Sequence, residues 1–235
     1  MKHVKKSLIL SAILLSGLLS GQSGFTIKMK FVTQGLPEQY AAAGEMEMVM
    51  YSKGDKYKSE TSSMMFNNTS YFDGITLISL NEFMGNKTAY KTTKEELEPT
   101  LDPNESKPSI EYTNEKKMIA GYECSKAIIS KIMKDKSESK SIVWYTDKIR
   151  MNNELVRKAN KRSSIDLGDL KGVPLAFESK GKMFGMDVTT IMTVTEILTT
   201  DIPDSVFVPN TEGYEVDSYK VYMDKMKAMQ QGGGR

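Results

Sequence analysis

The residue types that most often carry out catalysis or bind metals are nearly absent from this chain. Its only histidine is His3, and its only cysteine is Cys124. His3 lies in the predicted leader, so the mature protein would have no histidine. That excludes Ser-His-Asp and Cys-His catalysis and a histidine site for zinc, iron or haem. A lone cysteine also excludes an intrachain disulfide and a CxxC redox pair. Cys124 lies in a predicted strand with no histidine to activate it, so we expect a buried structural residue. We expect no cofactor and no metal.

Acidic side chains are the remaining candidates for catalysis. They form two groups in the sequence, Glu95, Glu96 and Glu98, and Asp201 and Asp204. A glycosidase needs two carboxylates that face each other across a cleft, one of them with a raised pKa. Both groups lie in polar, lysine-containing segments, where solvated charges or a helix N-terminus explain them better. We therefore expect a protein that is not an enzyme.

Methionine is the most over-represented residue type, with 17 in 235 residues. Met46, Met48 and Met50 alternate with other residues and would share one face of a strand. Three interpretations stay open: ordinary core packing, a pliable apolar groove for a ligand, and a thioether site for Cu(I). Copper would lack its usual histidine and cysteine ligands. For a groove, the predicted ligand-binding residues are Phe31, Met46, Met48, Met50 and Met192.

The N-terminal segment has the order of a secretory signal peptide. Residues 1–23 begin with three lysines, continue with an apolar run from Leu8 to Leu19, and end in small residues. The run is shorter than the roughly 20 residues that a transmembrane helix needs. Cleavage would follow Gly21 or Ser23. Without the leader lysines, 29 basic residues face 30 acidic ones, so the net charge is −1. Nothing in this balance indicates binding to nucleic acid.

The predicted export and the single cysteine together favour a bacterial envelope compartment over a eukaryotic secreted one. Small secreted eukaryotic domains are usually rich in disulfides, which this chain cannot form. Four Asn-x-Ser/Thr sequences occur, at Asn67, Asn68, Asn86 and Asn104, and chance in a bacterial protein rich in lysine and threonine explains them. We expect the periplasm or outer envelope of a Gram-negative bacterium.

The elements that must position these residues are mainly strands. Apolar and polar residues alternate from Phe25 to Phe31 and from Met46 to Met50, which is typical of antiparallel sheet with one wet face. The fold class is mainly β (α+β), with nine or more strands in one meander and a single curved sheet built from both halves of the chain. Further strands are predicted at Lys56–Glu60, Ser70–Asp73, Thr76–Leu80, Thr88–Lys91, Glu123–Ile132, Ser141–Thr146, Ala176–Lys180 and Met186–Ile197.

Few helices are predicted. Thr93 and Glu96 have the spacing of a capping box, which opens a short helix ending near Pro99. The stretch Asn153–Asn160 is either a helix or a loop. An amphipathic helix over residues 216–231 is predicted from a cap at Asp217 and from helical spacing of its apolar side chains, Tyr219, Tyr222, Met223, Met226 and Met229.

Four segments together resemble a known family. They are Ile119–Cys124, Val143–Thr146, Leu170–Leu175 and Ile202–Pro209, the last followed by Gly213 and Tyr214. Their order resembles an envelope domain of unknown function (DUF4412-type) related to the GLPGLI proteins, and is similar in plan to the periplasmic lipoprotein carrier LolA. The resemblance covers roughly residues 25–215. It implies an incomplete barrel with helices against its concave face, the face that holds acyl chains in the carriers.

These observations lead to one functional hypothesis and one alternative. We predict a signal peptide at 1–23, a LolA-like β domain at 24–215, and a helix with a glycine-rich tail at 216–235. The β domain would hold a lipid, acyl chain or apolar peptide on its concave face without catalysis. The alternative is an envelope scaffold whose C-terminal helix contacts a partner protein or a membrane surface through residues 216–231.

Overall fold

The computed structural model describes residues 24–93, 96, 107–133, 136–149, 167, 169–183 and 185–232. The predicted signal peptide and the stretch Asn153–Asn160, expected as a helix or a loop, lie outside these residues. In the described part of the chain, no helix is long and apolar enough to cross a membrane.

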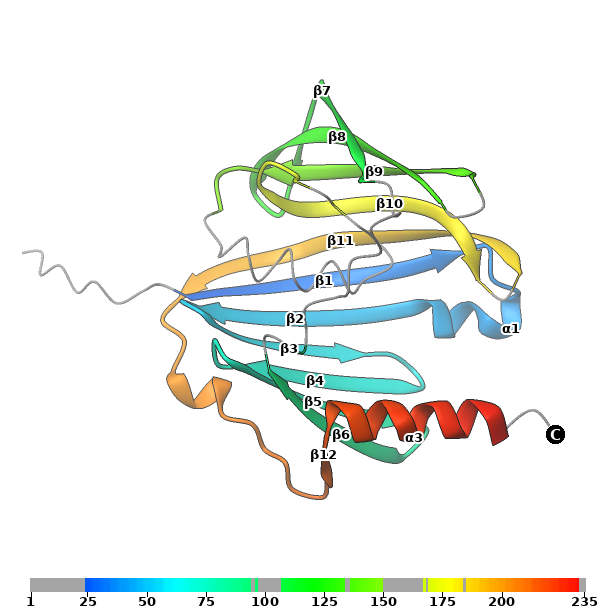
Figure 1. Ribbon diagram of the computed structural model, residues 1–235. Coiled ribbons are helices and arrows are strands. Elements are labelled where there is room, and N and C mark those ends of the chain that lie inside the picture. The colour runs from blue at the N-terminus through cyan, green and yellow to red at the C-terminus, as the bar shows by residue number, and fades with distance from the viewer. Residues whose placement is uncertain are drawn as a thin grey trace, which may run out of the picture.

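Strands dominate the described residues and form a single 12-stranded sheet (Figure 1). Its order is β12-β6-β5-β4-β3-β2-β1-β11-β10-β9-β8-β7. The strands are β1 (Gly24–Gln34), β2 (Glu45–Lys53), β3 (Lys56–Ser62), β4 (Phe66–Phe72), β5 (Thr76–Phe83), β6 (Asn86–Thr93), β7 (Ser109–Ile119), β8 (Tyr122–Ile132), β9 (Glu138–Thr146), β10 (Val173–Met183), β11 (Met186–Thr200) and β12 (Val216–Ser218).

Two runs of strands meet in the middle of this sheet. Strands β1 to β6 lie side by side in chain order, and so do β7 to β11. The runs join through β1 and β11, which pair antiparallel from Gly24–Thr200 to Gln34–Thr189. The prediction of one sheet built from both halves is therefore confirmed. The prediction of one simple meander is wrong, because the strand next to β1 comes from the far end of the chain.

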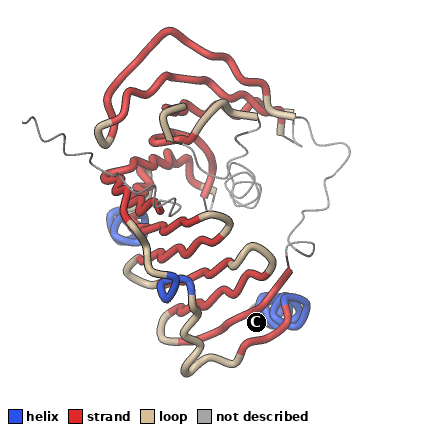
Figure 2. Tube along the Cα trace, turned by 90° about the vertical axis from the view of Figure 1, so that its left-hand side faces the viewer, coloured by secondary structure: helices blue, strands red, loops and turns tan. Residues whose placement is uncertain are grey.

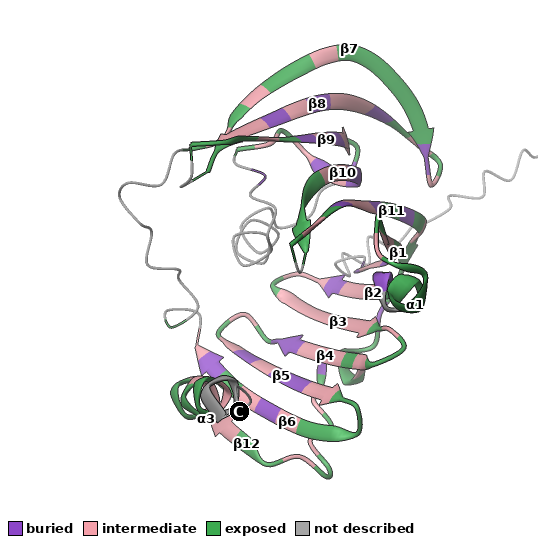
Figure 3. Ribbon diagram, turned by 90° about the vertical axis from the view of Figure 1, so that its right-hand side faces the viewer, coloured by how far each residue is buried: buried purple, intermediate pink, exposed green. Residues whose placement is uncertain are grey.

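The sheet is open and strongly bent. Seen along its strands, it curves from β7 at one edge to β12 at the other without closing (Figures 2 and 3). Neighbouring strands are antiparallel except for β12, which runs parallel to β6. The fold class predicted from sequence, a mainly β protein with an open curved sheet, is confirmed.

The helices are short, apart from the last. They are α1 (Glu38–Ala41), the 3₁₀ helices η1 (Ala42–Gly44) and η2 (Asp204–Phe207), and α3 (Tyr219–Gly232). Helix α3 lies on the concave side of the sheet, against β6 (Figure 3). The predicted cap at Asp217 is wrong. Ser218 Oγ accepts the N–H of Val221 at 3.4 Å, whereas Asp217 belongs to β12 and its carboxylate binds Lys225 Nζ at 2.7 Å.

Two further features near the middle of the chain can be compared with the predictions from sequence. The capping box is present: Thr93 N–H donates to Glu96 Oε2 at 3.0 Å, and Glu96 N–H donates to Thr93 Oγ1 at 3.3 Å. The helix it would open lies outside the described residues. Strand β7 was not predicted, because this edge strand is exposed on both faces and has no alternating pattern.

The main core forms where β1 meets β8 to β11. Ile27, Val143 and Leu175 are almost fully buried there. Cys124 lies in the same core with no exposed surface, and burial raises the pKa of its thiol. This is the inert environment expected for a structural cysteine. A smaller cluster of Tyr71, Leu80 and Ala89 packs on β4, β5 and β6.

Candidate binding face

Strand register places all five predicted ligand-binding residues on one face of the sheet. Directly opposed residues of antiparallel strands point to the same side. Phe31 of β1 lies opposite Met46 of β2 and also opposite Met192 of β11. Met48 and Met50 follow Met46 at every second position of β2, so they share this side.

This shared side is the concave one. Met50 begins a row of opposed residues that crosses β3, β4 and β5 and ends at Tyr90 of β6. The Tyr90 ring contacts Tyr222 and Tyr219 of α3, at centroid distances of 4.6 and 5.2 Å. Because α3 lies inside the curve of the sheet, the methionines of β2 face the concave side as well (Figure 3).

The five residues differ in how far they are buried. Phe31, Met46, Met48 and Met50 are half-buried, and Phe31 and Met50 pack against the main core. Met192 is only 5% exposed and belongs to the core. Next to Met192 on the neighbouring strand lies Phe177, whose ring meets Phe31 edge-on with centroids 6.2 Å apart. Met192 therefore lies beside Phe31 on the same face but belongs to its buried part, so it offers a ligand almost no surface.

Beyond β2, the middle of the concave face is polar, between an apolar row of Tyr57, Phe72 and Leu77 and the Phe66–Phe83 pair. Two rows of opposed residues continue the methionines across β3 to β6, and none of their side chains is charged. We call this surface the neutral polar half. Its rows are Thr61, Asn68, Asn81 and Thr88 after Met48, and Ser59, Ser70, Ser79 and Tyr90 after Met50.

Hydrogen bonds order the neutral polar half around one amide. Asn68 Nδ2 donates to Ser79 Oγ at 2.9 Å, to Leu80 O at 3.2 Å and to Asn81 Oδ1 at 2.9 Å. Ser70 Oγ donates to Asn68 Oδ1 at 3.1 Å. Among the described residues, Asn81 Nδ2 is a buried side-chain donor without an acceptor. Such a donor costs free energy until an acceptor reaches it.

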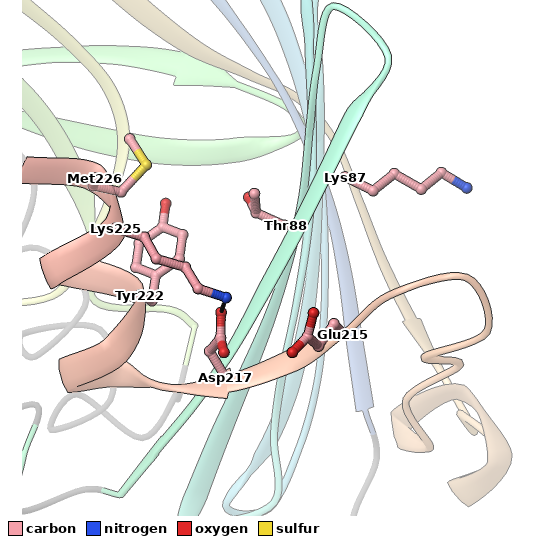
Figure 4. Close-up of a pocket in the computed structure, with 7 residues that line it drawn as sticks. All are labelled: Lys87, Thr88, Glu215, Asp217, Tyr222, Lys225 and Met226. Atoms are coloured by element: carbon pink, nitrogen blue, oxygen red, sulfur yellow. Dashed lines mark hydrogen bonds and ion pairs between the residues drawn. The ribbon is translucent and has the colours of Figure 1, made fainter. Parts of the chain in front are cut away.

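A small pocket of about 80 Å³ lies between α3 and β6 (Figure 4). Thr88 points toward the helix in this view, whereas Lys87 points away on the other side of β6. Burial raises the pKa of the Tyr222 phenol, so this hydroxyl stays neutral. The lining residues are Lys87, Thr88, Glu215, Asp217, Tyr222, Lys225 and Met226.

The acidic groups singled out in the sequence serve structural roles where the structure describes them. Asp201 and Asp204 approach Lys53 Nζ at 3.6 and 3.2 Å. Glu96 belongs to the capping box. Glu95 and Glu98 lie outside the described residues. Within the described ranges, no group of three or more His, Cys, Asp or Glu side chains is placed to hold a metal ion.

Comparisons with known proteins yield distant likenesses of fold. No protein-family model matches the chain, and no curated protein matches it. A structure of PNGF-II in the P21 space group has a TM-score of 0.44 at 14% identity, covering 86% of this chain and 33% of that one. The chain thus spans about a third of PNGF-II. A putative outer membrane lipoprotein-sorting protein domain from Vibrio parahaemolyticus has a TM-score of 0.29 at 11% identity, covering 80% of this chain and 90% of that one.

Proposed function

We propose that this chain is an exported, non-enzymatic binding protein of the bacterial cell envelope, with a LolA-like plan, that holds a hydrophobic ligand on its concave face. The observation that carries the proposal is the half-buried row of Met46, Met48 and Met50 beside Phe31 on that face.

Burial of apolar surface would supply the affinity. Each Å² of apolar surface removed from water contributes about 25 cal/mol. Unbranched methionine side chains repack at low cost, so the face can accept acyl chains of different shapes. The proposal therefore expects a ligand class rather than one compound.

Because part of the concave face is polar and uncharged, we expect the hydrophobic ligand to be an amphiphile. A pure hydrocarbon that lay across the concave face would leave the Asn68, Ser70 and Ser79 network in contact with nothing polar. An amphiphile with an uncharged, hydroxyl-bearing head would place its chain on the methionines and its acceptors beside Asn81 Nδ2. This arrangement satisfies both halves of the face.

The alternative, an envelope scaffold acting through the C-terminal helix, has less support. Tyr219 and Tyr222 of α3 already contact Tyr90 of the same chain. Part of the apolar side of α3 is therefore occupied within the protein. Its docking on a partner would require those contacts to break.

The test uses two substitutions at neighbouring positions of β2. Met48→Glu places a carboxylate on the concave face, while Val49→Glu places the same group on the opposite face, where Val49 lies across from Lys28. The probe is cis-parinaric acid, a fluorescent fatty acid, and native mass spectrometry of protein purified from the periplasm identifies bound lipid. We expect Met48→Glu to weaken probe binding by about tenfold or more, because its charge must be desolvated under the chain.

Val49→Glu should bind the probe like the unmodified protein. Thermal unfolding monitored by circular dichroism checks that both variants fold. The proposal is wrong if the unmodified protein binds neither probe nor lipid, or if the two folded variants lose affinity equally.

A further inference from the structure

Five of the connections between strands lie along one end of the sheet, because of the directions in which the strands run. Strands β1, β3, β5, β8 and β10 all run the same way, because successive neighbours around them are antiparallel. The connections β1–β2, β3–β4, β5–β6, β8–β9 and β10–β11 therefore lie at the same end, on the right-hand side of Figure 1. We call this end the hairpin rim.

The hairpin rim concentrates exposed apolar side chains. Each of its five connections, or the strand end beside it, carries at least one, and Met64 and Met84 are 75% and 69% exposed. The opposite end has fewer among the described residues: Ile75 in the β4–β5 turn, Met118 near the end of β7, Leu198 in β11, and Val208 directly after η2. The exposed apolar residues of the hairpin rim are Tyr40, Met64, Met65, Phe83, Met84, Ile132, Met133 and Met183.

The β3–β4 and β5–β6 tips, which are neighbours at one end of the hairpin rim, form one ordered patch. The Met84 N–H donates to Met65 O at 3.1 Å and joins the β5–β6 turn to the β3–β4 turn. Phe83 lies opposite Phe66, so an aromatic pair continues from these tips onto the concave face. The β3–β4 tip, residues 62–67, contains no charged side chain. The exposed apolar residues of these two turns therefore form one connected patch, because a backbone hydrogen bond and a strand pairing join them. Scattered single apolar residues on a surface have no such connection.

Met84 occupies a backbone conformation that disfavours it. Its φ is +49°, and Gly85 follows with φ +82°. A two-residue hairpin turn with positive φ at both positions favours Asn-Gly or Asp-Gly. A bulky residue in this left-handed region is strained, and strain of this kind concentrates at functional sites. Met84 therefore places an exposed apolar side chain at the tip of the rim at the cost of backbone strain.

We propose that the hairpin rim docks into the interfacial region of a lipid bilayer. The apolar groups project from separate turns along a curved edge, and a fluid lipid surface can surround each tip, whereas a folded partner would need one contiguous complementary surface. Flexible methionines, with Phe83 and Tyr40, suit shallow insertion into the headgroup and acyl boundary. The β3–β4 tip, which carries no charge, indicates that insertion, rather than attraction to anionic lipid, supplies the affinity.

The rim also leads directly to the candidate binding face. Phe31 and Met46 form the concave-facing pair of β1 and β2 that lies nearest the hairpin rim. A chain that leaves the bilayer at the docked rim would meet this pair first and then Met48 and Met50. This passage rests on the proposed function, whereas docking of the rim stands without it.

Vesicle sedimentation with matched variants tests the docking. The rim variant combines Met64→Gln, Met84→Asn and Met133→Gln, and the control combines Ile75→Gln and Met118→Gln at the opposite end. Vesicles are either phosphatidylcholine alone or phosphatidylcholine with about a quarter phosphatidylglycerol. We expect the unmodified protein and the control to sediment with both kinds of vesicle, also in about 0.5 M NaCl. The rim variant should have a vesicle partition coefficient lower by about tenfold or more.

Three outcomes would overturn the docking proposal. The first is an equal loss in the control, and the second is binding confined to anionic vesicles at low salt. The third is absence of vesicle binding, together with a dimer in analytical ultracentrifugation that the rim substitutions abolish. That result would make the rim an interface between two copies of the chain.

Binding of cis-parinaric acid without vesicles separates this proposal from the proposed function. The rim variant should bind the probe normally, because the rim residues it changes lie outside the row of β2 methionines. Vesicle docking without probe binding would leave the docking proposal intact and contradict the proposed function.

Discussion

Met84 shows at the scale of one residue how this chain gives up stability for an exposed apolar group. The residue has positive φ and is 69% exposed, so its side chain gains little from packing that would offset the strained backbone. Asparagine tolerates the same conformation, because its short polar side chain bonds locally.

Met84→Asn should therefore raise the free energy of unfolding by roughly 0.5–1 kcal/mol. Urea titration monitored by circular dichroism measures this change. Met64→Asn is the control, because Met64 is equally exposed but is not among the residues with positive φ. A lower stability in Met84→Asn, or the same gain in Met64→Asn, would show that backbone strain is not the cause.

The C-terminal helix is held to the sheet by few contacts in the described residues. Between Tyr219 and Met226, the described side chains of α3 are exposed or half-buried, and its aromatic residues meet the sheet at Tyr90. The Lys225–Asp217 ion pair adds a second link, to β12. An isolated helix of this length is marginal in water, so these contacts should decide whether it forms.

Tyr222→Ala should loosen α3 and leave the sheet intact. Loss of the Tyr90–Tyr222 ring contact costs about 1 kcal/mol, which corresponds to roughly five- to tenfold faster amide hydrogen exchange within α3. Hydrogen exchange with mass spectrometry on peptides from the helix and from β1 measures both regions. Val221→Ala removes an exposed side chain and should change neither rate. Equal acceleration in both variants would mean that Tyr90 does not hold the helix.

At the scale of the whole molecule, Lys53 joins segments that are far apart in the chain. Its Nζ donates to Ile202 O at 2.8 Å and lies 3.2 Å from Asp204 Oδ1, so the β2–β3 turn holds the segment that leaves β11. The hydrogen bond from Lys53 is the largest cause that lowers the pKa of Asp204. A lowered carboxyl pKa stabilises the folded state above the ordinary carboxyl range, and this gain is lost as the pH falls through the lowered value.

Lys53→Gln should therefore lower the Tm at neutral pH more than at acidic pH. We expect the difference in Tm between the variant and the unmodified protein to shrink as the pH falls from about 7 to about 3. Differential scanning calorimetry across this range measures it. A difference that stays constant with pH would mean that Asp204 does not depend on Lys53 for its ionisation.

Sequence patterns located most strands because their faces differ in exposure. The alternation from Phe25 to Phe31 and from Met46 to Met50 corresponds to β1 and β2, and the long β-branched run from Met186 corresponds to β11. Strand β7 was missed because an edge strand exposed on both faces carries no period. The cap of α3 was assigned one residue early, because Asp217 and Ser218 are both good caps and only the pairing of β12 with β6 chooses between them.

The amino-acid sequence by itself determined which residue types are scarce, which strands have an apolar side, and which methionines would share a face. These properties depend on residue type and on the period of two, and both are local. Only the tertiary structure decided that β1 pairs with β11, that the methionine rows run into the neutral polar half, and that exposed apolar side chains gather at the hairpin rim. Each of these depends on strand order and direction, which long-range hydrogen bonding sets and local sequence does not record.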